Sequence, residues 1–318
     1  MQLLVSRRTS VLAALITAAL AAPAAASAAP APANVSLEVG HLKGGKAAIL
    51  SSVPVSGTLS PFVAGESVDL LFFRNGHQVG SETVDVHNGP GGSGTFQTKF
   101  RVRRDGRFAV QAVHEASAGQ QGAASVRRQF GVSYPNLGPG KCGRVVRAFK
   151  KEMHKLGYVP SGGSCMNDKD ARAVLAYRKV NGKDHNTHAG KGIVKRVFSG
   201  RGAFHLKYPN AGKHAEVSIE RQVLVLADGD KPLQTYGVST GKSSTPTVRG
   251  HFQFYLRQPG YNAEGMYFST YFHGGYAVHG YASVPPTYPA SHGCVRVPIP
   301  DALQIYNSVS LGEDIYVY

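Results

Sequence analysis

The sequence Ser291-His292-Gly293-Cys294-Val295-Arg296 lies near the C-terminus, and eleven residues separate its serine from His279 of the upstream pair His279-Gly280. A cysteine nucleophile needs a base that generates the thiolate, a group that orients the base, and donors for the developing oxyanion. Residues of all three kinds are present in this stretch. It therefore predicts a thiol active site, and the domain around it can be delimited by working outward.

Each residue of the stretch has an expected role. Cys294 is the predicted nucleophile and His279 its base. Gly280 has no side chain, so only its backbone carbonyl can orient the imidazole. The amides around Gly293 and Cys294 can line an oxyanion hole. The predicted substrate-binding residues are Ser291 and Arg296, the arginine because a guanidinium suits a carboxylate.

Alternatives to these roles remain open. His273-Gly274 is a second His-Gly pair. His292 could be the base, since side chains two apart share one face of a strand, but we expect it to support the site. Zinc could be held by His279, His292 and Cys294, although a coordinated thiolate would block the chemistry, so we expect no metal and no cofactor. Arg296 could instead pair with Asp301.

Short strands surround the stretch and predict a mostly β domain over residues 213–318. Val217 and Ile219 alternate with polar residues, and residues 223–226 are continuously apolar. Pro300-Asp301 is typical of a helix start, and Ala302, Ile305 and Val309 would form the buried stripe of that helix. Residues 315–317 predict a closing strand.

Two further domains are predicted upstream. Residues 29–133 contain about seven strand-like segments, among them 67–73, 96–102 and 107–113, which favour an immunoglobulin-like sandwich. The last two flank Arg104-Asp105-Gly106, a hairpin signal. In residues 134–212, Val146, Phe149, Met153 and Leu156 have helical spacing, Gly157 ends that helix, and a second helix is expected after Asn167-Asp168. The fold class is therefore multidomain and mainly β, with a small three-helix domain in the middle.

The charge of the chain is concentrated in the middle domain. The formal net charge is +16, and residues 141–213 carry 17 Lys and Arg against 4 Asp and Glu. A segment of this kind predicts a polyanionic partner. His185 and His188 lie beside Asp184 there, but without further ligands they are better explained as a polar loop than as a metal site.

The N-terminus indicates the compartment. Arg7 and Arg8 precede an apolar run at residues 11–22 and a small-residue cleavage candidate at 26–28, which together predict a secretory signal peptide over residues 1–28. An uncleaved membrane anchor is the alternative, although the run is rich in alanine and interrupted by Pro23. No later segment approaches the length of a spanning helix, so the mature chain is expected to have no transmembrane segment.

Export favours a disulfide among the three cysteines. Cys142 and Cys165 are close in one segment and are the natural pair, which leaves Cys294 as a free thiol. Export also makes nucleic acid an improbable partner, so an anionic cell-wall polymer is the expected partner of the basic segment.

The stretch from Ser291 to Arg296, with His279-Gly280 upstream, resembles the active-site signature of the L,D-transpeptidases (YkuD-type domain). Further segments of residues 217–318 agree with this family: Gly237-Val238-Ser239-Thr240-Gly241, Thr245-Pro246, Gly250-His251-Phe252 and Gly265-Met266. Residues 143–182 also resemble a peptidoglycan-binding three-helix domain, from which they differ in their many basic residues and two cysteines.

The resemblance implies a function. Cys294 would attack a peptidoglycan tetrapeptide stem, release its terminal D-Ala and form a thioester, and a neighbouring stem would accept the acyl group in a 3→3 cross-link. Stem peptides would thus be donor and acceptor, in the cell wall or the periplasm-equivalent space, with release from the cell as the other location. The alternatives are an L,D-carboxypeptidase or other cysteine hydrolase of wall peptides, and a non-catalytic wall-binding protein.

Overall fold

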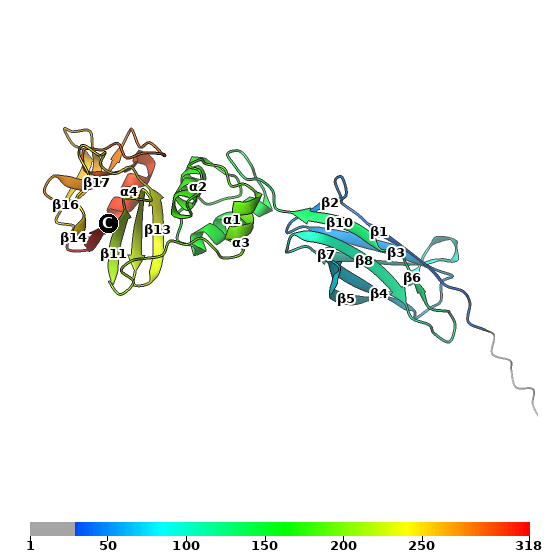
Figure 1. Cartoon of the computed structure of the whole chain (residues 1–318). Coiled ribbons are helices and arrows are strands. Elements are labelled where there is room, and N and C mark those ends of the chain that lie inside the picture. Colours follow the sequence, from blue (N-terminus) through cyan, green and yellow to red (C-terminus); the bar gives the residue numbers. More distant parts are fainter. Residues whose placement is uncertain (1–28) are drawn as a thin grey trace, which may run out of the picture.

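The computed structural model describes residues 29–318, which form three groups of elements in chain order (Figure 1). Strands β1–β10 come first, helices α1–α3 follow, and strands β11–β19 with helix α4 come last. The architecture is multidomain and mainly β, as the sequence predicts. The predicted signal peptide, residues 1–28, lies outside the described residues. No helix within residues 29–318 has the length and apolar character needed to cross a membrane.

The first group consists of two sheets that share one apolar core. One sheet has the order β1-β3-β7-β6, and the other has the order β2-β10-β8-β4-β5 with β9 paired to β8. The elements are β1 Asn34–Val39, β2 Lys46–Ala48, β3 Ser52–Ser60, β4 Ser67–Arg74, β5 His77–Asp85, β6 His87–Asn88, a 3-10 turn Pro90–Gly92, β7 Gly94–Arg101, β8 Gly106–His114, β9 Ala123–Ala124 and β10 Arg128–Ser133.

The predicted hairpin around Arg104-Asp105-Gly106 is wrong. Both flanking segments are strands, but β7 pairs with β3 and β8 pairs with β4 and β10, so they belong to different sheets. The chain crosses between the sheets at the fully buried Val102, whose N–H donates to Ser51 O at 3.0 Å. The turn residues predict only that the chain reverses direction. They are equally compatible with a hairpin within one sheet and with a connection between two sheets. The estimate of about seven strands also missed the shortest strands, β2, β6 and β9.

The middle group contains α1 (Arg144–Lys155), α2 (Asp168–Val180) and α3 (Lys191–Phe198). The predicted stripe of α1 is buried, with Val146, Phe149 and Met153 at most 1% exposed. Gly157 follows the helix with φ +79°, and a side chain there would overlap Pro232 O. Asn167 caps α2 in a capping box that uses the Asp170 carboxylate. These local signals explain why the helices begin and end where they do.

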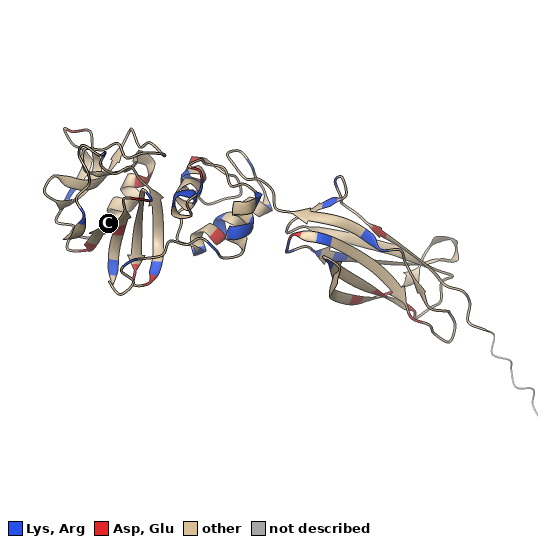
Figure 2. Ribbon diagram, in the orientation of Figure 1, with Lys and Arg blue, Asp and Glu red and all other residues tan. Residues whose placement is uncertain are grey.

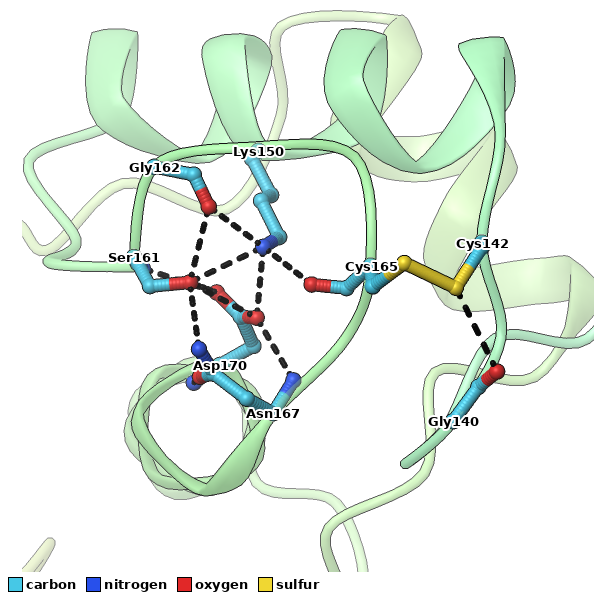
Figure 3. Close-up of polar contacts among 8 residues, drawn as sticks. All are labelled: Gly140, Cys142, Lys150, Ser161, Gly162, Cys165, Asn167 and Asp170. Atoms are coloured by element: carbon cyan, nitrogen blue, oxygen red, sulfur yellow. Dashed lines mark hydrogen bonds and ion pairs between the residues drawn. A yellow bond between two sulfur atoms is a disulfide. The ribbon is translucent and has the colours of Figure 1, made fainter.

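The connection between α1 and α2 is held by a buried ion pair and a disulfide (Figure 3). Lys150 Nζ lies 2.7 Å from an Asp170 oxygen and also donates to Ser161 Oγ at 2.9 Å and Cys165 O at 2.6 Å. Burial of a lysine is tolerated only when it is paired and hydrogen-bonded in this way. Cys142 and Cys165 form a disulfide at the other end of the connection.

The last group has two sheets with α4 packed on one of them. Their orders are β13-β12-β11-β19-β14 and β15-β16-β17-β18, and α4 contacts β16, β17 and β18. The elements are β11 Lys213–Ser218, β12 Val223–Asp228, β13 Lys231–Gly237, β14 Gly250–Gln253, β15 Leu256–Tyr261, β16 Tyr267–His273, β17 Tyr276–Tyr281, β18 Val295–Pro298, α4 Ile299–Ser308 and β19 Asp314–Val317.

The helices cover one face of the five-stranded sheet. Leu224 and Leu226 of β12 join the core of the last group, whereas Val223 and Val225 join the core of the helices. Alternation along a strand places these two pairs on opposite faces. β12 is therefore buried on both sides, which explains its continuous apolar sequence.

Three basic side chains of α2 attach the helices to the last group. Lys169 Nζ donates to Gln304 Oε1 at 2.8 Å. Arg172 holds both oxygens of Asp301, at 2.7 and 2.9 Å. Lys179 is 3% exposed and donates to Val238 O at 2.9 Å and Gln222 O at 3.3 Å. Their sequence spacings of three and seven place them on one face of the helix.

Candidate active site

Strands β17 and β18 bring the predicted catalytic residues to one face of the four-stranded sheet. The two strands are parallel, with Val278 opposite Val295 and His279 opposite Arg296. Cys294 directly precedes β18, so its register position is opposite Ala277. Side chains two apart share a face, which places Cys294, Arg296 and His279 on the same side.

His279 is held as a neutral imidazole. The side chain is 3% exposed, and Nδ1 lies 3.0 Å from Gly280 O. Since a carbonyl only accepts, Nδ1 carries the proton and Nε2 keeps its lone pair. The pKa of His279 is lowered to about 4, mainly by burial; the Gly280 hydrogen bond opposes this effect and the charge of Arg296 adds to it. At neutral pH the ring can therefore accept a proton.

Cys294 is a free thiol on the same face of the sheet as this imidazole. It is half-buried, and its Sγ lies 3.7 Å from Gly275 O. Burial raises the pKa of the thiol, while a backbone contact with Ala277 and the charge of Arg296 oppose the rise. The resting side chain is thus protonated and needs a base before it can attack.

Arg296 is not paired with Asp301, so that alternative from the sequence is wrong. Asp301 is occupied by Arg172 from α2. The Arg296 guanidinium instead lies 4.0 Å from the centre of the Tyr281 ring and donates to Ala290 O at 3.2 Å. Within residues 29–318 no carboxylate pairs with this guanidinium, which lies on the face of Cys294 and is available to an anionic group.

Ser291 supports the loop before Cys294 and has no exposed surface for a substrate. It is 1% exposed; its hydroxyl donates to Cys294 O at 2.6 Å and accepts from Gly293 N at 3.0 Å. Ser291 thus has little surface that could reach a substrate. The Gly293 amide is likewise bonded to Ser291, which leaves the Cys294 amide as the other expected oxyanion donor.

Two glycines are required by close packing. Gly293 has φ +120°, and a Cβ there would overlap the Tyr276 ring. A Cβ at Gly280 would lie 2.7 Å from Ala302 Cβ of α4 and 3.2 Å from Tyr267 O. These distances are shorter than ordinary van der Waals contacts. Tyr276, Tyr267 and helix α4 can therefore pack against Gly293 and Gly280 only because these two positions have no side chain.

Sequence reasoning missed the residues that support Ser291 from behind. Thr240 O accepts from Ser291 N at 3.0 Å, and Thr240 is itself held by Gln222 through its backbone N–H at 2.9 Å and its hydroxyl at 2.6 Å. Gln222 O in turn accepts from Lys179 of α2. A chain of buried hydrogen bonds thus runs from α2 to the Cys294 loop. Thr240 lies in a quoted motif, but nothing in the sequence identifies Gln222 or Lys179.

The other histidines lie outside this arrangement. His292 is exposed, and its Nε2 lies 3.2 Å from Lys242 Nζ. His273 is exposed at the end of β16. Among residues 29–318, no three His, Cys, Asp or Glu side chains gather in a way that could hold a metal ion. Neither His292 nor His273 has the buried, oriented imidazole found at His279.

The C-terminal residues match a known family. Residues 212–317 match the family model of the L,D-transpeptidase catalytic domain, YkuD. These residues are an L,D-transpeptidase domain. The match includes the strands that carry His279 and the free thiol of Cys294. No curated protein matches the sequence.

The first of two similar solved structures agrees with this identification. A crystal structure of an L,D-transpeptidase from Xylanimonas cellulosilytica DSM 15894 is 27% identical, has a TM-score of 0.52, and covers 58% of this chain and 98% of that chain. The catalytic domain of the E. faecium L,D-transpeptidase is 20% identical, with a TM-score of 0.30, and covers 33% of this chain and 96% of that one. The share covered by the first structure exceeds residues 212–317, so the likeness extends beyond the L,D-transpeptidase domain.

Proposed function

We propose that this chain is an exported peptidoglycan L,D-transpeptidase that forms 3→3 cross-links through a thioester on Cys294. The observation that carries the proposal is the placement, on one face of a sheet within an L,D-transpeptidase domain, of a free thiol and a neutral imidazole whose Nδ1 is held by Gly280 O. The resting thiol and the neutral base together hold one transferable proton. That is the starting state for nucleophilic attack with general-base assistance.

The first half-reaction proceeds on the donor stem. The thiol leaves its contact with Gly275 O, its proton passes to His279 Nε2, and sulfur attacks the carbonyl between the third and fourth residues. The Cys294 N–H donates to the developing oxyanion, since the Gly293 N–H is already bonded to Ser291 Oγ. The carbon–nitrogen bond breaks, His279 returns the proton to the departing amine, and D-Ala leaves a thioester on Cys294.

The second half-reaction decides the product. An amine of a neighbouring stem attacks the thioester, and His279 takes its proton. The carbon–sulfur bond breaks, the proton returns to the sulfur to restore the thiol, and the product is a 3→3 cross-link. Attack by water gives a tripeptide instead, the L,D-carboxypeptidase outcome. Arg296 binds a stem carboxylate, because its guanidinium stacks on Tyr281 with no acid beside it. His292, exposed beside the nucleophile, shapes the entrance.

The upstream parts serve delivery. Residues 1–28 direct export, residues 29–133 form an immunoglobulin-like spacer, and residues 134–212 form a peptidoglycan-binding-like module. The basic residues of the module attract anionic cell-wall polymers rather than nucleic acid, and Figure 2 shows Lys and Arg distributed over its helices. The disulfide between Cys142 and Cys165 suits an oxidising compartment outside the cytoplasm.

Trapping the acyl-enzyme tests the proposal. The protein without residues 1–28 is incubated with a disaccharide-tetrapeptide and with a carbapenem, and intact mass is measured. We expect an adduct on the wild type and none on Cys294→Ala, with His279→Gln acylated more slowly by at least about a hundredfold. A wild-type protein that forms no adduct with either compound would instead favour the non-catalytic wall-binding protein.

A further inference from the structure

A wide cleft lies between the helical module and the L,D-transpeptidase domain, outside the thiol site. It has a volume of about 840 Å³. The side chains that line it include Arg196 and Arg201 from the module and Arg221 from the L,D-transpeptidase domain, with Glu220 as an acidic neighbour. All three arginines are exposed, and within residues 29–318 none of them lies within 4.0 Å of a carboxylate.

The guanidiniums of two of the arginines are hydrogen-bonded to the end of α2. Arg221 donates to Val180 O at 2.7 Å, and Arg196 donates to Asn181 Oδ1 at 3.4 Å, so the two guanidiniums converge on the C-terminal end of α2. Each guanidinium has five N–H donors, which leaves several without a protein acceptor. Charged groups held in place in this way lose little freedom when they bind a ligand.

The rim that carries Arg201 is equally well held. Its carbonyl accepts from Tyr177 Oη at 3.0 Å, and the next carbonyl, of Gly202, accepts from Tyr158 Oη at 2.6 Å. Both tyrosines are fully buried, with rings 5.3 Å apart. Gly202 has φ +101°, and a Cβ there would lie 2.5 Å from Tyr177 Oη, so the rim depends on glycine.

The chemistry of the lining indicates the ligand. The rim also contains Gly182 and Gly200, where a Cβ would meet nothing within 4 Å, so the backbone leaves open space for a bulky chain. Among the described residues, the lining has no Phe, Tyr or Trp ring on which a sugar could stack, and its only rings are the imidazoles of His185 and His205. Guanidinium forks recognise carboxylate or phosphate oxygens. The ligand is therefore recognised by its charge.

We propose that this interdomain cleft binds the anionic groups, carboxylate or phosphate, of the cell-wall polymer on which the enzyme works. The choice of a wall polymer as the ligand rests on the proposed function. The inference goes further because it assigns the binding of that polymer to three named arginines rather than to the basic residues of the module in general. Because these arginines come from two domains, the site exists only while α2 is docked on the sheet.

Binding to purified sacculi tests the site. The triple variant Arg196→Gln, Arg201→Gln, Arg221→Gln is compared with a control of equal charge change on exposed residues of the first group, Lys43→Gln, Lys99→Gln, Arg103→Gln. Exposed charge contacts contribute a factor of about two to five each, so we expect at least about tenfold weaker binding for the cleft variant and less than twofold for the control. Equal losses in both variants, or no loss in the cleft variant, would overturn the proposal.

Further measurements identify the ligand and check that each variant is folded. Sacculi stripped of phosphodiester polymers should bind as before if peptidoglycan carboxylates are recognised, and weakly if phosphates are; both results support the site. Tighter binding to duplex DNA than to sacculi would overturn the wall-polymer assignment. Thermal unfolding checks each variant, and Arg201→Gln alone replaces the triple if the triple does not fold.

Turnover separates this inference from the proposed function. The cleft variant should cleave a soluble disaccharide-tetrapeptide at the wild-type rate, because the short substrate reacts at Cys294. A wild type that does not react contradicts the proposed function, whatever the binding result.

Discussion

Gly293 is the residue at which the active-site loop is most constrained. It has φ +120°, and any Cβ would overlap the Tyr276 ring. We expect Gly293→Ala to lower activity by at least about tenfold and the free energy of unfolding by about 1–3 kcal/mol, since both strain and overlap must be relieved. Gly275→Ala is the control, because a Cβ there meets nothing within 4 Å. Similar effects of both substitutions would show that the overlap is not the cause.

His279 makes stability depend on pH. Its pKa is lowered from 6.5 to about 4 by burial, so between those values the unfolded chain binds a proton that the folded chain does not. Stability therefore falls as pH decreases through this window, by at most about 3 kcal/mol. Urea unfolding at pH 7 and pH 4.5 should show a loss about 2 kcal/mol larger for the wild type than for His279→Gln. As a control, the variant His77→Gln, which changes an exposed histidine, should lose as much free energy of unfolding as the wild type. If His279→Gln also loses as much as the wild type, His279 is not the buried neutral ring that causes the pH dependence.

At this scale the sequence predicts reacting groups better than supporting ones. Cys294 and His279 follow from chemical type and spacing, and the structure places them on one face. The burial of Ser291 and its bond to the Gly293 amide could not be predicted, because internal hydrogen bonds depend on packing that a motif does not contain. The same is true of Arg296, whose presumed partner Asp301 is bound by a helix far away in the sequence.

Helix α2 supports the L,D-transpeptidase domain through Arg172. Its guanidinium holds both oxygens of the buried Asp301 at the start of α4. Arg172→Met leaves that carboxylate buried without its partner, so we expect the free energy of unfolding to fall by about 2 kcal/mol or more. The control Lys155→Met removes the more exposed pair with Glu152 and should cost less than about 1 kcal/mol. If chemical denaturation gives similar losses in free energy of unfolding for Arg172→Met and Lys155→Met, then α2 does not stabilise the L,D-transpeptidase domain through Arg172.

Elements with strong local signals were predicted well. The stripe from Val146 to Leu156, a second helix that begins next to Asn167 and a helix that includes Pro300 all appear in the structure. The pairing of strands was not predictable in the same way. Arg104-Asp105-Gly106 reverses the chain in either topology, and only the burial of Val102 between two sheets decides which one forms.

The whole molecule carries its excess charge in the middle, between two nearly balanced ends. We expect binding to purified sacculi to weaken by at least about tenfold between 50 and 500 mM salt, because exposed charges are screened within a Debye length of about 10 Å at 0.1 M. The rate on a soluble tetrapeptide should change by less than about twofold over the same range. Sacculus binding that does not respond to salt would contradict an electrostatic role for the basic residues.

The order of the modules was readable from composition, whereas their docking was not. The five-stranded sheet presents Val223 and Val225 to the helices, but a continuous apolar run does not say which neighbour covers it. The cleft and the hydrogen-bond chain to Ser291 both result from this docking. They became visible only when the two domains were seen together.

The central claim is that Cys294 transfers a stem peptide to an amine. Its most direct test is incubation of the protein lacking residues 1–28 with a purified disaccharide-tetrapeptide, with products followed by mass spectrometry and Cys294→Ala as control. We predict cross-linked dimers and released D-Ala with the wild type and neither product with the variant. Tripeptide without dimers would contradict transpeptidation and identify a carboxypeptidase, and dimers formed by Cys294→Ala would contradict the account of the thiol altogether.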